Sequence, residues 1–200
     1  MGKKVITVAR QFGSMGRPIA IELAEKLGFE YYDRDIIEKA AMDMGVPVYE
    51  LQEIDDHKAP GYKKMMFPLG IGGGAKQDRL FGIEREIILK LAKEQDCVIV
   101  GRCADFILTE AGHAGLFNIF IYATYQQRFQ FSLNNLGLTN EAIEKTIRRV
   151  DEGRANYYTH YTGERFDSPK YRDLMINSAS MDLGKVSGAI AHCAKMRFGL

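Results

Sequence analysis

Residues 5–18 read VITVARQFGSMGRP, a short apolar run that passes directly into a segment with two glycines. The β-branched residues of its first half are typical of a buried parallel strand. After the glycines, apolar residues at helical spacing predict a helix that ends at Gly28: Ile19, Ala20, Leu23, Ala24 and Leu27. A turn between a strand and a helix directs backbone N–H groups and the positive end of the helix dipole to one point. The stretch therefore predicts a phosphate-binding turn.

This turn matches the phosphate loop G-x-x-x-x-G-K-[ST] only in part. Gly16 stands at the second glycine, and Arg17 stands at the lysine. Gln11 replaces the first glycine, and Pro18 replaces the residue whose hydroxyl binds Mg²⁺. Arg17 can neutralise phosphate, although its planar guanidinium differs from the compact charge of lysine. The alternative is an ordinary turn with glycines for steric reasons, but Arg10 and Arg17 would then crowd a helix dipole of their own sign.

The rest of the chain alternates strands with helices. Apolar runs predict strands at residues 29–32, 97–101, 118–122 and 174–177, and helical spacing predicts helices from Asp33, Pro47, Ile83, Thr124, Thr139 and Ser180. Thr124 and Gln127 also form a candidate capping box. Residues 58–75 lose this periodicity and are typical of a flexible loop. The alternation predicts an α/β fold, a three-layer sandwich with a parallel sheet, in one domain over residues 1–200. Ligands of such sheets bind after the strands, here after Ala9, Tyr32, Gly101 and Tyr122.

Composition and net charge argue against several classes of protein. The 200 residues are 46% hydrophobic, enough for a sizeable core, and the formal net charge is +1. This balance gives no reason to expect binding to nucleic acid or to an anionic membrane. The three cysteines lack metal-ligand spacing and are typical of reduced thiols, and no apolar stretch approaches a membrane span. We therefore expect a soluble, cytoplasmic protein.

Residues 6–17, followed by Y-Y-D-R at residues 31–34, resemble the cytidylate-kinase-like family, whose members read like S-R-Q-x-G-S-G-G-R before a helix and Y-Y-D-R. Gly101 and Arg102 resemble the G-R-D segment of cytidylate kinases. The similarity covers essentially the full chain and extends to an arginine-rich lid: Arg148, Arg149, Asp151 and Arg154. The resemblance implies a P-loop NTP hydrolase or nucleotide-kinase-like fold. Its small lid would span about residues 148–168, and its insert for the nucleoside monophosphate (NMP) about residues 58–78.

The resemblance also implies a reaction, namely transfer of the γ-phosphoryl group of ATP, with Mg²⁺, to a nucleotide acceptor such as CMP. The residues implied for the donor phosphates are Arg10, Gly13, Ser14, Met15, Gly16 and Arg17. Those implied for the acceptor are Asp33, Arg34, Arg102 and Asp151. Charge on the transferred group would be stabilised by Arg17, Arg148, Arg149 and Arg154. No residue is implied as a protein ligand of the metal.

Other interpretations stay open. Arg17 and Pro18 depart from the lysine and hydroxyl of true cytidylate kinases, and Met15 adds bulk where the branch has glycine. The alternative function is therefore a nucleotide-binding regulatory protein without phosphotransfer, and a third is a plain anion-binding scaffold. Asp33 has the alternative role of a helix N-cap, and Arg148 and Arg149 that of a solvated helix face. Tyr157 and Tyr158 could stack on a base or could equally be interface or core aromatics. The sequence leaves open which acceptor is used and whether copies of the chain associate.

Overall fold

The structure, a computed structural model, describes residues 2–33 and 75–200. Within these residues a five-stranded sheet is parallel throughout, in the order β2-β3-β1-β4-β5. Its strands are β1 (Val5–Arg10), β2 (Glu30–Tyr32), β3 (Cys97–Val100), β4 (Leu116–Tyr122) and β5 (Leu174–Asn177). The predicted α/β fold with a parallel sheet is therefore confirmed.

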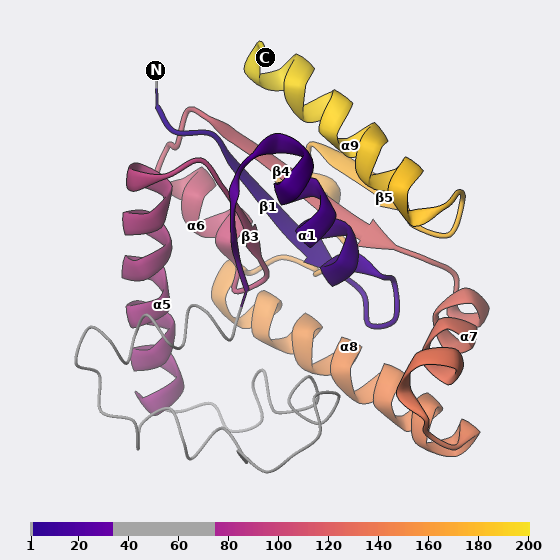
Figure 1. The fold of residues 1–200 in the computed structure, drawn as a ribbon. Helices are drawn as coiled ribbons and strands as arrows, with labels where there is room; N and C mark the ends of the chain where they lie inside the picture. Colours follow the sequence, from indigo (N-terminus) through magenta and orange to yellow (C-terminus); the bar gives the residue numbers. More distant parts are fainter. Residues whose placement is uncertain (1, 34–74) are drawn as a thin grey trace.

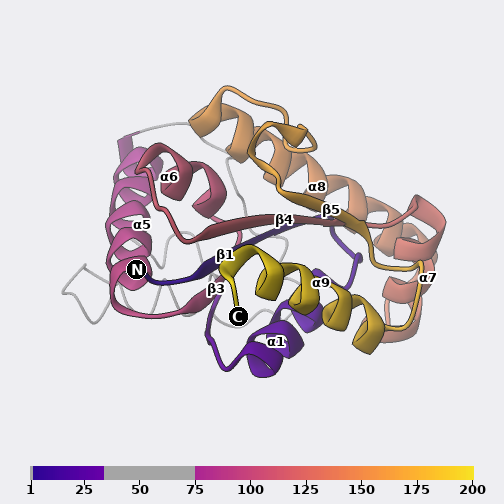
Figure 2. The ribbon, with the colours of Figure 1, turned by 90° about the horizontal axis from the view of Figure 1, so that it is seen from above.

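Helices cover both faces of the sheet, which gives three layers (Figure 2). One face carries α1 (Gly16–Leu27) and α9 (Leu183–Phe198), and the other carries α5 (Ala75–Glu94), α6 (Ala104–Glu110) and α8 (Asn140–Thr162). Because side chains alternate along a strand, Ile6 and Val8 of β1 pack with α1 and α9, whereas Val5 packs with α5 and α6. Each face thus contributes to a separate apolar core.

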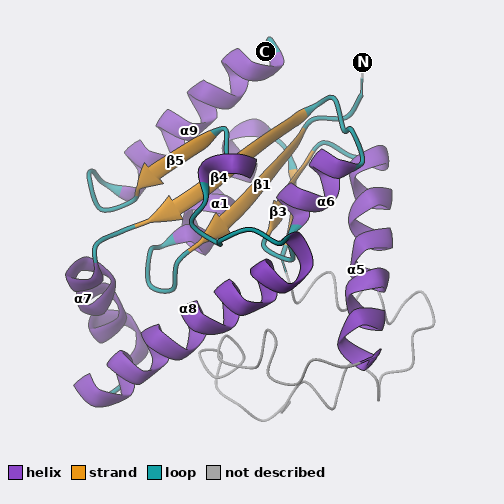
Figure 3. Ribbon diagram, turned by 180° about the vertical axis from the view of Figure 1, so that it is seen from behind, coloured by secondary structure: helices purple, strands orange, loops and turns teal. Residues whose placement is uncertain are grey.

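The carboxyl ends of the strands lie at one edge of the sheet, and α8 crosses that edge (Figure 3). Helix α7 (Tyr125–Leu136) follows β4 and lies beside the start of α8 (Figure 1). The predicted capping box at its start is confirmed, because Thr124 accepts from the backbone N–H of Gln127 while the Gln127 side chain accepts from the N–H of Thr124. The turns after β1, β2, β3 and β4, where ligand binding was predicted, therefore lie at a common edge.

Some predicted boundaries differ from those of the structure. The last helix begins at Leu183 rather than near Ser180, because residues 178–181 form a turn that Asp182 ends as the N-cap. Helix α5 already begins at Ala75, inside the range predicted for the NMP-binding insert. The remainder of that range, the predicted helices between Asp33 and residue 57, and Arg34 lie outside the described residues. The insert stays a prediction, and so does the lid, whose first residues belong to one unbroken helix, α8.

Among the helices of the described ranges, none combines the length and the apolar character needed to cross a membrane. Cys97, Cys103 and Cys193 are all free thiols.

Alkaline pH is expected to destabilise the fold. Burial raises the pKa of the Cys97 and Cys103 thiols from 9.0 to about 12 each. The unfolded chain therefore loses these protons first, so the free energy of unfolding is highest below pH 9.0 and falls as the pH approaches 12. Urea unfolding at about pH 8 and about pH 10.5 measures the fall. Cys97→Ala should reduce the fall, and Cys193→Ala, at a half-exposed thiol, should not; equal falls in both variants would contradict this account.

Candidate functional site

The turn between β1 and α1 presents several open backbone N–H groups. Gly13 (φ 72°) and Met15 (φ 57°) adopt the left-handed conformation, which curls the backbone between them. In the described ranges, the N–H groups of Gly13, Met15 and Gly16 donate to no protein acceptor. Successive N–H groups in such a curled turn form a concave site for an anion. The predicted turn thus has the donors that phosphate requires.

Gln11 fastens this turn to the end of β4. Its N–H donates to the carbonyl of Ile121 over 3.1 Å, and its side-chain Oε1 accepts from the N–H of Ala123 over 3.2 Å. The hydroxyl of Ser14 lies 2.9 Å from the carbonyl of Gln11 and 3.1 Å from that of Ile121. Gln11 therefore holds the turn through a side chain that the glycine of the usual motif lacks. The Ser14 hydroxyl is directed to protein carbonyls.

Two arginines, Arg10 and Arg154, lie next to each other at the same edge. Arg154 of α8 is 7% exposed, and its Nη1 donates to the carbonyl of Arg10 over 2.9 Å. Burial lowers the pKa of Arg154 to about 10, and burial together with the charge of Arg154 holds the pKa of Arg10 well below its ordinary value. Within residues 2–33 and 75–200, neither guanidinium forms an ion pair with a carboxylate. Two adjacent cations of this kind repel each other, and a bound anion would relieve that repulsion.

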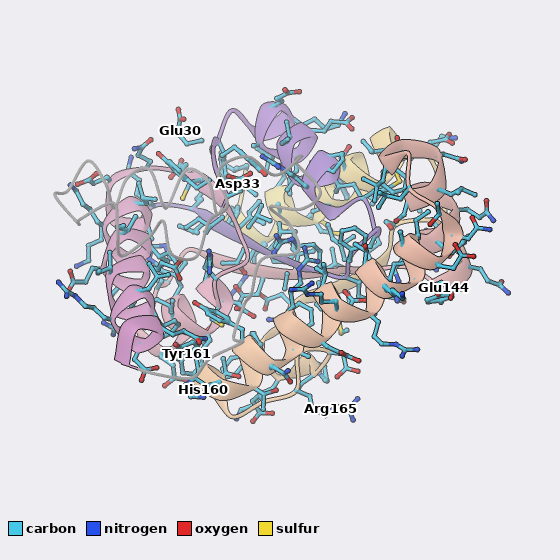
Figure 4. All side chains as sticks on the ribbon, turned by 90° about the horizontal axis from the view of Figure 1, so that it is seen from below. Glu30, Asp33, Glu144, His160, Tyr161 and Arg165 are labelled. Atoms are coloured by element: carbon cyan, nitrogen blue, oxygen red, sulfur yellow. The ribbon has the colours of Figure 1, made fainter. Side chains whose placement is uncertain are left out.

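Arg17 forms an ion pair with Asp33, which follows β2. Its Nη2 lies 2.7 Å from Oδ2 of Asp33, and the hydroxyl of Tyr31 donates to the same oxygen over 3.1 Å. Burial, with a contribution from the Asp33 charge, raises the pKa of Tyr31 to about 12. In Figure 4, Asp33 lies inward beside α1, whereas Glu144 and Arg165 project outward. Arg17, which was predicted to bind the donor phosphates, thus contacts Asp33, which was predicted to bind the acceptor nucleotide.

Arg102, two residues after the end of β3, is held by residues from two other elements. Its Nε lies 3.1 Å from Oε1 of Glu84 on α5, and the hydroxyl of Tyr157 donates to Oε2 of Glu84 over 2.9 Å. The Arg102 guanidinium also lies 5.8 Å from the centre of the Tyr157 ring. Glu84 was not predicted as a site residue, although a charged residue among the apolar Ile83, Ile87 and Ile88 was a usable signal.

A second buried group, also made of an arginine, a carboxylate and a tyrosine, lies nearby. The hydroxyl of Tyr158 donates to Oδ2 of Asp105 over 3.0 Å, and Asp105 forms an ion pair with Arg172. Asp105 is itself buried, and its ion pair is with Arg172 rather than with Arg102. Tyr157 and Tyr158 are also buried, in one cluster with Cys103, which matches their interpretation as core aromatics.

A further ion pair at this edge joins α7 to α8. Arg128 forms an ion pair with Asp151, and both contact the backbone of Phe12. Asp151 was implied as an acceptor-binding residue, and Arg128 was not singled out. Arg148 and Arg149, implied as lid residues, are exposed on α8 and line neither of two cavities at this edge that contain Arg10 and Arg154. Arg148 and Arg149 thus stay predictions that no contact of this structure supports.

Those two cavities share Arg10 and Arg154. The larger, about 210 Å³, lies over the turn from Gln11 to Arg17 and is closed by Phe131, Ser132 and Leu136. The smaller, about 30 Å³, lies beyond β1 among Gly101, Arg102, Tyr157 and Phe166. Because both arginines line both spaces, the structure joins the predicted donor turn to the predicted Arg102 through a pair of cations.

Comparisons with known proteins agree with this fold. The model of the cytidylate kinase-like family matches residues 5–180. A solved structure of an uncharacterized protein from Eubacterium ventriosum is 19% identical, with a TM-score of 0.74 over 96% of this chain and 99% of that one. A gluconokinase from Sinorhizobium meliloti is 13% identical (TM-score 0.56, 98% and 94% covered), and a shikimate kinase from Acinetobacter baumannii in complex with shikimate is 13% identical (0.53, 96% and 92%). A search of curated proteins gave no match.

Proposed function

The chain belongs to the cytidylate kinase-like family, and from this premise we propose that it transfers the γ-phosphoryl group of ATP to a nucleoside monophosphate or a similar small acceptor. The observation that carries the proposal is the sharing of Arg10 and Arg154 by both cavities. A phosphoryl group that passes from one cavity to the other would stay beside these two cations throughout. Positive charge and alignment are what catalysis of this transfer chiefly requires.

The larger cavity suits the donor. The N–H groups of Gly13, Met15 and Gly16 would bind the β- and γ-phosphates, and Arg10 and Arg154 would neutralise their charge. The described part of the chain contains no cluster of three side chains that could ligate a metal. Mg²⁺ would therefore be held mainly by the donor phosphates and water, where it neutralises charge.

The smaller cavity suits the reacting end of the acceptor, with Arg102 and, beside the turn, Asp33 as its positioning residues. An oxygen of the acceptor would attack the γ-phosphorus while the bond to the oxygen that bridges the β- and γ-phosphates breaks. ADP would leave with that electron pair. A phosphate oxygen of a nucleotide acceptor is already nucleophilic at neutral pH, so the step requires no general base. Arg10 and Arg154 would stabilise the charge on the transferred group.

The second candidate function is nucleotide binding without transfer. It is favoured by Pro18, which has no hydroxyl, and by the ion pair that holds Arg17 at Asp33. Incubation with ATP, Mg²⁺ and a panel of nucleoside monophosphates and small hydroxyl acceptors separates the two. We expect ADP release that depends on one acceptor. ATP binding without ADP release would support the regulatory function, and stabilisation by sulfate but by no nucleotide would support an anion-binding scaffold.

Removal of the Arg17 charge should weaken donor binding. In Arg17→Ala, ATP loses a cation of the first helical turn, so we expect its dissociation constant to rise about tenfold. Isothermal titration calorimetry with ATP measures the change. Lys26→Ala removes the same charge at the other end of α1 and should bind ATP like the parent. Unchanged affinity in Arg17→Ala would show that this side chain does not contact the donor.

A further inference from the structure

Phe12, the residue before the open N–H groups, is held at three points by α7 and α8. Its side chain is 4% exposed and packs with Ile143, Ile147 and Val150 of α8. Its N–H donates to Oδ1 of Asp151 over 2.8 Å, and its carbonyl accepts from Nη1 of Arg128 over 3.1 Å. Both polar groups of one backbone residue are therefore bound to side chains that come from two different helices.

Asp151 and Arg128 are also bound to each other, through Oδ2 and Nη1. One oxygen of Asp151 accepts from the turn and the other accepts from Arg128, so both are engaged in protein contacts. This arrangement differs from the acceptor contact that the family resemblance implies for Asp151. It joins α7, α8 and the phosphate-binding turn through a single carboxylate.

The turn has little freedom to move once Phe12 is held. A Cβ atom on Gly13 would lie 2.8 Å from the backbone oxygen of Arg128 and 2.9 Å from Oγ of Ser132, so α7 abuts the turn. On α8, Arg154 lies one turn after Asp151 and holds the carbonyl of Arg10. Two residues on one face of α8 thus fix the backbone on both sides of Gln11.

We propose that Asp151 is a positioning residue, which with Arg128 fixes the Phe12 backbone and so sets where the N–H groups of Gly13 to Gly16 point. The inference rests on the proposed function, because those N–H groups are the ones that would bind the donor phosphates. Donors of this kind act only when they are held close to the productive geometry, and a displacement of about 1 Å is enough to impair them. Asp151 acts through the turn and touches no reacting atom.

Asp151→Asn tests the proposal. The amide keeps the size of the carboxylate but loses its charge, and its NH₂ group would face the Arg128 guanidinium. We expect the dissociation constant for inorganic pyrophosphate, measured by isothermal titration calorimetry, to rise about tenfold. The amide proton of Phe12, observed by NMR without ligand, should move upfield because its acceptor is no longer charged. Asp151→Glu, which restores the charge, should recover part of both signals.

Val150→Ala is the matched control, because it removes packing from the same helix and the same cluster but leaves the Asp151 contacts in place. It should lower the melting temperature, while its effects on pyrophosphate affinity and on the Phe12 amide should be much smaller than those of Asp151→Asn. Parent-like affinity in Asp151→Asn, or an equal loss in Val150→Ala, would overturn the positioning role while the proposed function stands. A different result would overturn the transfer reaction and keep the positioning role: the parent binds pyrophosphate, Asp151→Asn binds it more weakly as expected, and no acceptor leads to ADP release. A parent that binds no pyrophosphate would overturn both.

Discussion

Arg10→Met should strongly reduce turnover and at the same time stabilise the unliganded protein. The aliphatic stem of Arg10 lies against Gly16, where an added Cβ would be 2.6 Å from the Arg10 Cβ, and methionine keeps that stem. The substitution removes a cation whose pKa is held down by burial and by Arg154. Loss of a preorganised charge at the transferred group reduces turnover by about 10²–10³-fold. Removal of an uncompensated cation is expected to raise the free energy of unfolding by about 1 kcal/mol.

Two measurements check this prediction, ADP release and urea unfolding without ligand. Arg197→Ala, at an exposed arginine of α9, removes the same charge far from both cavities and should change neither. The two effects of Arg10→Met are expected to have opposite signs, which distinguishes a functional cation from a structural one. A variant that is less stable than the parent would show that Arg10 has a counterion in the unliganded protein. A variant with parent-like turnover would remove Arg10 from the reaction.

The strand–turn–helix unit and the caps could be predicted because their causes are local. The β-branched run of β1, the glycines of the turn and the apolar spacing of α1 all act within a few residues. The capping box at Thr124 is equally local, since its two bonds join residues three apart. That the carboxyl ends of the strands share one edge follows from the predicted alternation of parallel strands and helices. The strand order β2-β3-β1-β4-β5 was not predicted, because it depends on contacts between distant segments.

The cluster of charged residues on α8 does not by itself show which arginine lies inside the site. Arg148, Arg149 and Arg154 look equivalent as a run of charges, yet Arg154 is buried and the other two are exposed. The helical phase was a usable signal, because Arg154 follows Ile147 by seven residues and so shares its inward face. Nothing in the spacing, however, could pair Asp151 with the N–H of Phe12, 139 residues away in the chain. Contacts of that range depend on the docking of α8, which local pattern does not encode.

Gly101→Ala should impair the reaction by displacing Arg10, although no charged residue is replaced. Gly101 has φ +82°, and a Cβ atom there would lie 2.4 Å from Nη1 of Arg10. The end of a flexible side chain can move away, so the clash itself adds little to the loss of stability. The left-handed conformation of alanine lowers the free energy of unfolding by about 1 kcal/mol. The displaced guanidinium no longer lies between the two cavities, and we expect ADP release to fall at least about tenfold.

Gly112→Ala is the control for backbone strain, because Gly112 has φ +66° and an added Cβ would meet nothing within 4 Å. Urea unfolding should give similar losses of stability for both variants, whereas only Gly101→Ala should lose turnover. The double variant Gly101→Ala with Arg10→Met sharpens the test, since the methyl group then has no guanidinium to displace. Its turnover should equal that of Arg10→Met alone, because two changes that act through one group do not add. A further loss in the double variant would mean that Gly101 acts on the site by a route other than Arg10.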